Sequence, residues 1–131
     1  MSFYERFLND IDELKKRYPF FEMIPVNPEI LTQTTMLDVD DQTKCAILAI
    51  DTSMRMQDLV DDSNKDRYVL STDLLSALFY RYLASPFQQY HYQILTDCVA
   101  KQNELKQQFS HSNDPALKEQ IDNIFVMPFM A

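Results

Sequence analysis

The sequence contains no glycine, whereas an average composition would place about nine glycines in a chain of 131 residues. Glycine is the residue that most readily adopts a positive φ angle or lets the backbone approach a ligand closely. Its absence excludes glycine-rich phosphate loops and the dinucleotide-binding fingerprint, and it disfavours tight β-hairpins. The sequence therefore favours helices that are joined by turns containing Pro, Asn and Asp.

Positive charge is also scarce, because 12 Lys and Arg face 20 Asp and Glu, which gives a formal net charge of −8. Nucleic acids and anionic membrane surfaces are bound through Lys and Arg, so we expect neither as a partner. No apolar run approaches the roughly eighteen residues of a membrane span, and residues 2–6 lack the pattern of a secretory signal. We expect a cytoplasmic protein in which Cys45 and Cys98 are buried and reduced.

The spacing of apolar residues predicts an all-α fold of about six helices in one domain that spans residues 1–131. Ser2 and Glu5 form a capping box, and Asn27 and Asp114 each precede a proline at a first helical position. The predicted helices cover residues 2 to about 18, 28 to about 37, 41 to 62, 71 to about 84, 87 to about 109, and 115 to about 125. The fourth has a very wide apolar face, which predicts a central position or cover by a partner.

A cluster of polar and acidic residues ends the third predicted helix, at Gln57, Asp58, Asp61 and Asp62. Carboxylates four residues apart share a helix face, where they can hold a Mg²⁺ that also binds a diphosphate. A D-D-x-x-D motif has such a pair at its first and fifth positions, but Gln57 replaces the first carboxylate here. Asp58 and Asp62 form a second pair, rotated by about 100°, that could bind Mg²⁺ weakly. A solvated helix end without a binding role is the alternative, although acids there oppose the helix dipole.

The two histidines, His91 and His111, lack acidic or thiol partners at the spacing of a metal site. Nothing resembling a nucleophile elbow accompanies the serines. We therefore predict no metal site and no catalytic residue within this chain.

Two stretches resemble motifs of trans-prenyl diphosphate synthases. Residues 50–63, which read I-D-T-S-M-R-M-Q-D-L-V-D-D-S, are similar to the first aspartate-rich helix, typically I-H-T-A-S-L-x-H-D-D-V-x-D-D-S. Residues 69–76, V-L-S-T-D-L-L-S, resemble that family's V-L-A-G-D-x-L-x-S with Asp73 retained. The narrower resemblance is to the small subunit of two-component hexaprenyl or heptaprenyl diphosphate synthases. It extends over nearly the whole chain and includes the stretches 18–21, 49–58, 69–80, 95–99 and 103–106.

The departures from the catalytic pattern define what the resemblance implies. No second D-D-x-x-D follows the first, since Asp97 and Asp122 are isolated, and the arginine pair after the motif is reduced to Arg67. The resemblance thus implies a truncated, degenerate isoprenoid-synthase helical core that is inactive alone and holds no cofactor. It also implies a large catalytic subunit that binds Mg²⁺ and the isoprenoid diphosphates. The product would have about six or seven isoprene units and serve as a quinone side chain, as in menaquinone.

The resemblance further implies that this chain helps to set product length by closing or extending an apolar tunnel in the partner. Such a tunnel can hold the growing product because each buried CH₂ contributes roughly 0.8 kcal/mol. The fourth helix and the C-terminal tail carry more apolar side chains than six short helices readily bury. The residues predicted to contact the partner or the tunnel are Leu74, Leu75, Leu78, Phe79, Tyr82, Phe125, Met127, Phe129 and Met130. The alternative is that these residues form the chain's own core.

Two other functions stay open at this point. A free-standing acidic helical adaptor, unrelated to isoprenoids, accounts equally well for the composition and the fold, but not for the ordered match from residue 50 to 76. A complete small enzyme would require prenyl transfer by this chain alone.

Overall fold

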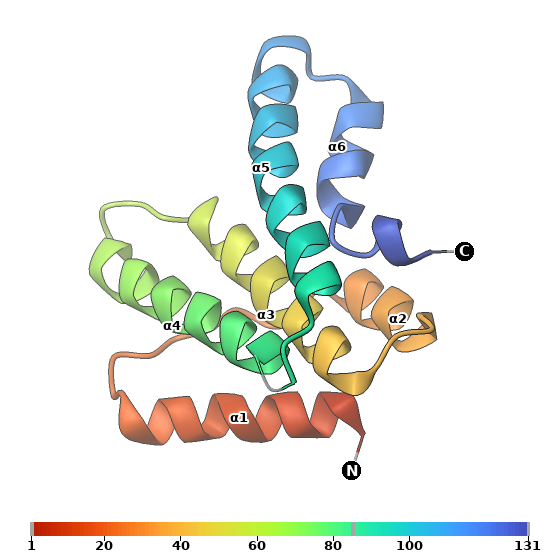
Figure 1. The fold of residues 1–131 in the computed structure, drawn as a ribbon. Coiled ribbons are helices and arrows are strands. Elements are labelled where there is room, and N and C mark those ends of the chain that lie inside the picture. The colour runs from red at the N-terminus through yellow and green to blue at the C-terminus, as the bar shows by residue number, and fades with distance from the viewer. Residues whose placement is uncertain (1, 85, 131) are drawn as a thin grey trace.

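The computed structural model describes residues 2–84 and 86–130. These residues contain six α-helices and a C-terminal 3₁₀ turn (Figure 1). They are α1 (Phe3–Arg17), α2 (Pro28–Met36), α3 (Asp41–Gln57), α4 (Lys65–Ala84), α5 (Gln89–Ser112), α6 (Pro115–Asn123) and η1 (Met127–Phe129). No β-strand occurs in these two ranges, and the predicted all-α fold is confirmed. Within them, no helix is long and apolar enough to cross a bilayer.

The central helix is α3, against which α1, α2 and α4 pack (Figure 1). Every residue from Cys45 to Met54 is buried. A helix that is covered on all faces needs an apolar surface all round, and the run Cys45–Ile50 supplies it over the first half. In the second half, the buried hydroxyl of Ser53 donates to the carbonyl oxygen of Thr72 on α4, with 3.3 Å between the oxygens. The buried hydroxyl of Ser53 therefore has a hydrogen-bond partner.

The first helix covers one end of this core. Phe7 and Ile11 of α1 are fully buried, and the hydroxyl of Tyr82 on α4 donates a hydrogen bond to the carboxylate of Asp10. Burial, together with this hydrogen bond, raises the pKa of Tyr82 above its ordinary value of 10.0. The contact connects α1 to α4 through a neutral phenol that is protonated at physiological pH.

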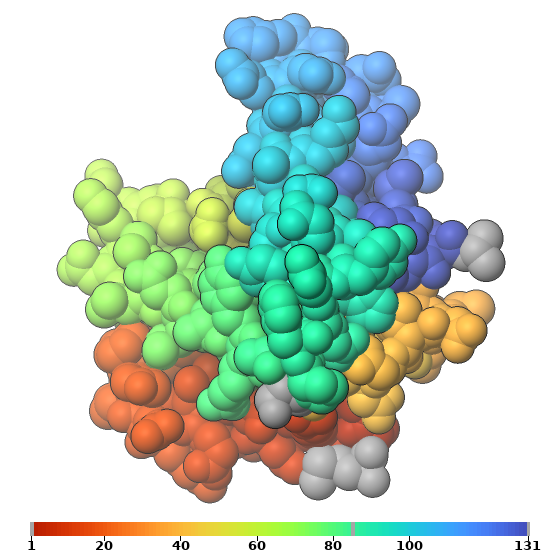
Figure 2. All heavy atoms as spheres, in the orientation of Figure 1, coloured from red at the N-terminus to blue at the C-terminus, as the bar shows by residue number. Residues whose placement is uncertain are grey.

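The last two α-helices form a hairpin that projects beyond the body made by the other helices (Figures 1 and 2). Asn113 joins α5 to α6 in the left-handed conformation, with φ 54° and ψ 29°. Asparagine adopts this conformation more readily than most residues other than glycine, so it takes the place of glycine in this glycine-free turn. The carboxylate of Asp114 then accepts the N–H of Ala116 at 3.0 Å and begins α6.

The predicted starts of four helices agree with the structure, but several boundaries do not. Side chains of Ser2, Asn27, Asp40 and Asp114 accept hydrogen bonds at the N-termini of α1, α2, α3 and α6. By contrast, α4 begins at Lys65, six residues before the predicted start at 71, and α5 covers Gln89–Ser112 rather than 87–109.

The early start of α4 has a physical cause. Ser71 or Thr72 would cap a helix if its hydroxyl accepted a backbone N–H two or three residues further on, but here neither hydroxyl does so. The Ser71 hydroxyl accepts the distant N–H of Glu22 at 3.0 Å. The Thr72 hydroxyl donates to the carbonyl of Val69, one turn earlier in the same helix, at 3.0 Å. Both residues therefore stay within a continuous helix.

Candidate functional site

The acidic motif lies where α3 ends and the chain turns toward α4. The helix ends at Gln57, and Asp58 is its C-cap, so the prediction that it continues to Asp62 is wrong. The expected helical spacing of Gln57 with Asp61, and of Asp58 with Asp62, is therefore lost. Carboxylates are unfavourable at a helix C-terminus because they oppose the helix dipole. Asp61 instead finds hydrogen-bond donors in the following turn.

Asp61 organises the turn between α3 and α4. Its Oδ1 accepts the N–H of Ser63 at 2.8 Å, the hydroxyl of Ser63 at 2.5 Å and the N–H of Asn64 at 3.2 Å. In return, the N–H of Asp61 donates to Oδ1 of Asn64 at 2.8 Å. The hydrogen bond from the Ser63 hydroxyl, followed by those from the backbone, lowers the pKa of Asp61 below 3.8. This carboxylate acts as a turn-forming group.

The other acids of the motif behave differently from each other. Asp58 accepts a charged hydrogen bond from the ammonium group of Lys106 on α5, with 2.9 Å between Nζ and Oδ1. Asp62 is exposed, and its side chain makes no hydrogen bond or ion pair to the rest of the described chain. In residues 2–84 and 86–130, no three His, Cys, Asp or Glu side chains lie close enough together to hold a metal ion. Two of the three motif carboxylates thus already have partners within the chain.

Gln57 faces a groove between α3, α4 and α5 that has a volume of about 300 Å³. We call it the motif groove. Its lining residues are Ile50, Met54, Gln57, Ser76, Phe79, Tyr80, Thr96, Val99 and Asn103. Apolar side chains and neutral hydroxyl or amide groups make up this set, and it contains no charged residue. The degenerate position of the motif therefore borders a neutral surface and not an anion-binding one.

A charge cluster with one buried member, Asp51, lies just before the motif and was not predicted from the sequence. Asp51 has only 1% of its surface exposed, and its Oδ2 accepts Nε of Arg55 at 2.8 Å. Nη2 of Arg55 donates to the carbonyl oxygen of Asp122 at 2.7 Å. The carboxylate of Asp122 also binds Nζ of Lys118 at 2.8 Å. The i, i+4 spacing of Asp51 and Arg55 was the available signal.

Burial dominates the electrostatics of this cluster. It raises the pKa of Asp51 above 3.8, although the hydrogen bond and positive charge of Arg55 act in the opposite direction. The cluster joins α3 to the end of α6 through Arg55 and Asp122. We therefore interpret it as a connection between the central helix and the projecting hairpin.

Asp73, from the second family-like stretch, lies on the exposed side of α4. It is separated from the acidic motif by the loop and the first two turns of that helix. The structure brings Asp73 into no hydrogen bond or ion pair with Gln57, Asp58, Asp61 or Asp62 within the described residues.

The residues predicted to contact a partner divide into two groups. Five of them, Leu75, Leu78, Phe79, Tyr82 and Phe125, are at most 3% exposed and belong to the chain's own core. Leu74 and Phe129 are partly buried against that core. Met127 and Met130 are 46% and 54% exposed. The burial of the first group agrees with the alternative that these residues form the chain's own core, and their contact with a partner stays a prediction.

Exposed aromatic side chains occur instead where α4 ends and α5 begins. Tyr80, Phe87 and Tyr90 are 51%, 61% and 75% exposed. Tyr92 lies between two of them, with ring centroids 5.6 Å from Tyr80 and 5.9 Å from Phe87. We call Tyr80, Phe87 and Tyr92 the aromatic face. Tyr90 lies two residues before Tyr92 on α5 and therefore on another side of that helix. The aromatic face borders the motif groove, because Tyr80 belongs to both, and such a cluster on a surface is typical of a binding site.

A family model described as HexPS-like, the small subunit of hexaprenyl diphosphate synthase, matches residues 1–130. The match includes every helix described above and the acidic motif at residues 57–62.

Proposed function

The chain belongs to the family of hexaprenyl diphosphate synthase small subunits, and we propose that it is the non-catalytic partner of a large subunit that performs prenyl transfer. In this complex the large subunit binds the isoprenoid diphosphates and Mg²⁺. This chain binds the large subunit, is required for its activity and helps to set the length of its product. The family match is the observation that carries the proposal.

The state of the acidic motif supports the non-catalytic part of the proposal. Prenyl transfer needs several carboxylates whose oxygens are free for Mg²⁺, and Mg²⁺ in turn holds the diphosphate. Here Gln57 supplies no charge, Asp58 binds Lys106 and Asp61 holds the turn to α4. Recruitment of these carboxylates to a metal would break contacts that shape the turn. We therefore expect no turnover by this chain alone.

The aromatic face and the motif groove are the surface that we assign to the large subunit. Aromatic residues are enriched at the centre of protein interfaces because they bury much area with few rotatable bonds. On the outer side of α4, Val69 and Leu70 are 46% and 47% exposed, which extends the apolar surface along the helix. Few charged side chains would lose solvent there, since the motif groove is lined without any.

Control of product length follows from the same placement. A growing polyprenyl chain gains roughly 0.8 kcal/mol for each CH₂ that is buried, so it lengthens as long as an apolar cavity continues. A subunit that lies against the large subunit can close that cavity or extend it without binding the diphosphate. The apolar side chains of Met127 and Met130 in the C-terminal tail are the second candidates for this contact.

The test is reconstitution from purified subunits. The large subunit is assayed with isopentenyl diphosphate, an allylic diphosphate and Mg²⁺, with and without this chain, and the products are separated by length. We expect synthesis of a product of about six isoprene units only when both subunits are present. Turnover by this chain alone, or an unchanged rate and product from the large subunit alone, would contradict the proposal.

The contact surface is tested by Tyr80→Ala and Phe87→Ala, which alter exposed side chains. Each is expected to weaken binding to the large subunit by roughly thirtyfold, the effect of losing a contact worth about 2 kcal/mol. Leu8→Ala on α1 is the matched control, because Leu8 is 38% exposed and lies on another helix. Equal affinities for all three variants would remove the aromatic face from the interface.

The family match decides against an acidic adaptor unrelated to isoprenoids. Two further parts of the proposal concern the cell: the product serves as a quinone side chain, as in menaquinone, and the complex is cytoplasmic. The second part is supported by two thiols, Cys45 and Cys98, which are both buried and free.

A further inference from the structure

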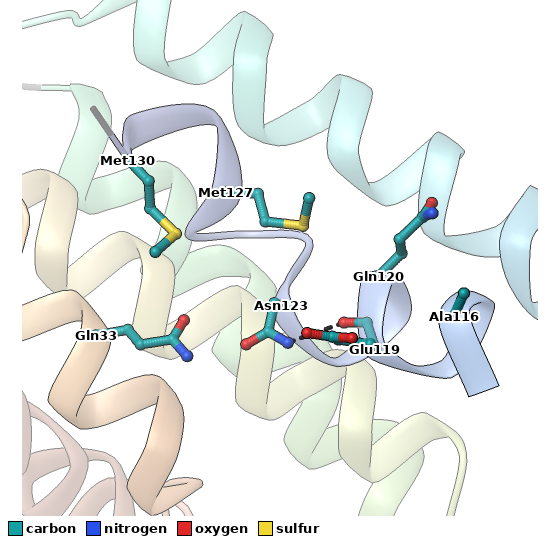
Figure 3. A pocket seen from close by; sticks show the side chains of 7 residues that line it. All are labelled: Gln33, Ala116, Glu119, Gln120, Asn123, Met127 and Met130. Atoms are coloured by element: carbon teal, nitrogen blue, oxygen red, sulfur yellow. Dashed lines mark hydrogen bonds between the residues drawn. The ribbon is translucent and has the colours of Figure 1, made fainter.

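A second groove lies between α2, α6 and the C-terminal turn, and it shares no lining residue with the motif groove. It consists of two adjoining depressions with volumes of about 340 and 270 Å³, and both are bordered by Gln33 and Met130. Figure 3 shows the first, where Gln33 projects from α2 toward α6 and the C-terminal segment, and Met127 and Met130 lie above it. In the space-filling view, α2 and the C-terminal segment lie side by side (Figure 2). We call this the methionine groove.

The methionine groove exposes apolar side chains that a folded protein usually buries. Met36, at the second depression, is 79% exposed, and Met127 and Met130 are 46% and 54% exposed. Methionine side chains are flexible and polarisable, and they are common on surfaces that receive the apolar face of a helix. The open form of the groove, bounded by helices on two sides, suits a helix more than a small molecule.

The charges around the groove indicate what kind of helix it receives. Glu119 lines one depression and Asp38 the other, and no Lys or Arg lines either of them. A Lys or Arg side chain of the occupant would supply the opposite charge to Glu119 and Asp38.

Two other occupants agree less well with these features. A second copy of this chain carries the same net charge of −8, so repulsion opposes self-association at an acidic groove. An isoprenoid diphosphate would bring its negative head group toward Asp38 or Glu119. The diphosphate carries no positive charge, and in a second copy of this chain the 12 Lys and Arg are outnumbered by 20 Asp and Glu.

We infer that the methionine groove binds an amphipathic helix of the large subunit whose apolar face is bordered by Lys or Arg. This inference rests on the proposed function, since it places a second contact of the same complex. The helix lies with its apolar side chains against Met36, Met127 and Met130, and its basic side chains reach Asp38 and Glu119.

Charge reversal in the complex tests the electrostatic part. The double variant Asp38→Lys/Glu119→Lys is expected to bind the large subunit at least about tenfold more weakly at low salt, with a smaller salt dependence than the unmodified chain. Asp12→Lys/Glu13→Lys on α1 makes the same change in net charge and should bind within about twofold of the unmodified chain. Met36→Ser, at a side chain that is mostly exposed, should weaken binding without lowering the thermal midpoint. Equal affinities for the groove and α1 variants overturn the inference.

Photocrosslinking identifies the occupant. A benzophenone amino acid replaces Met36 in one sample and Tyr80 in another, and the crosslinked peptides are sequenced from the assembled complex. We expect the Met36 sample to link to a helical, Lys- or Arg-containing peptide of the large subunit. A crosslink to a second copy of this chain, to an acidic peptide or to none, while the Tyr80 sample does link, overturns the inference and leaves the proposed function standing. Loss of both crosslinks, with no activity on reconstitution, instead contradicts the proposed function.

Discussion

Arg55 and Asp51 form an ion pair on the buried side of the central helix, with 2.8 Å between Nε and Oδ2. The carboxylate is 98% buried at the side-chain level, whereas about a quarter of the arginine side chain reaches solvent. The two members of the pair therefore differ in their surroundings. Asp51 depends on Arg55 as its charged partner, whereas Arg55 also contacts water and Asp122. This asymmetry makes the consequences of substitution predictable.

Asp51→Asn is expected to change the free energy of unfolding at pH 7 by less than about 1 kcal/mol, because the amide oxygen can still accept the arginine N–H. Asp51→Leu should cost about 1–3 kcal/mol, since it leaves the Nε donor of Arg55 without its acceptor. Urea denaturation of both variants measures the difference. Equal losses would show that the carboxylate charge itself is required.

The pH dependence of stability should carry the signature of the same residue. Burial raises the pKa of Asp51 above 3.8, so the folded chain holds this proton more tightly than the unfolded chain. Its contribution to stability is complete below pH 3.8 and is lost as the pH rises through the folded pKa. Compared with the unmodified chain, Asp51→Asn should therefore gain relative stability as the pH is raised from about 3.8. A constant difference between the two denaturation curves at all pH values would contradict this.

Two adjacent residues on α4 should have different roles, one in stability of the fold and the other in binding to the large subunit. Phe79 is 2% exposed and Tyr80 is 51% exposed. Phe79→Ala should lower the free energy of unfolding by about 3–5 kcal/mol, as other large-to-small changes in a core do. Tyr80→Ala should leave stability within about 1 kcal/mol and lose affinity for the large subunit. Calorimetric melting and a binding titration measure the two effects, and loss of stability in Tyr80→Ala would remove the distinction.

Mg²⁺ should matter for the activity of the complex and not for the fold of this chain. Asp58 and Asp61 are held by Lys106 and by the turn at residues 63–64, so Mg²⁺ gains few free carboxylates here. We expect EDTA to abolish prenyl transfer by the reconstituted complex and to leave the thermal midpoint of the isolated chain unchanged. Heat released on titration of this chain with Mg²⁺ and inorganic diphosphate would instead indicate a retained site.

The left-handed turn at Asn113 tests the effect of the missing glycine. Asn113→Ala should destabilise the α5–α6 hairpin by about 1 kcal/mol, because alanine enters this conformation less readily. Asn113→Gly should be neutral or stabilising, since glycine adopts it without steric cost. Thermal melting of both variants provides the comparison, with equal midpoints as the contrary result.

The sequence predicts local features of this fold better than it predicts tertiary ones. The helix caps at Ser2, Asn27 and Asp114 depend on a few neighbouring residues, and all three occur as expected. The end of α3 was misplaced because Asp61 forms its turn with Ser63 and Asn64, a competition that helical periodicity does not reveal. The start of α4 was misplaced because the partner of Ser71 lies at Glu22, far away in the sequence.

The predictions for the candidate site also succeed for local features and fail for tertiary ones. The incomplete motif and its family were visible in the order of residues 50–76, and the family match agrees. The sequence did not show which apolar residues of α4 belong to the core and which to the surface. That division depends on how α4 covers the buried middle part of α3, from Cys45 to Met54. The aromatic face was missed because Phe87 was predicted to lie in the apolar stripe of the fifth helix, whereas α5 begins at Gln89 and leaves Phe87 exposed.

The burial of α3 also bears on which of the residues in and after this helix tolerate substitution. From Cys45 to Met54 each side chain is constrained by the volume around it, whereas the acids after Gln57 lie beyond the packed part of the helix. Of these acids, Asp58 and Asp61 have contacts within the chain, whereas Asp62 has none in the described structure. A change at Asp62 can therefore alter the surface charge of the molecule and leave its helix packing as it is.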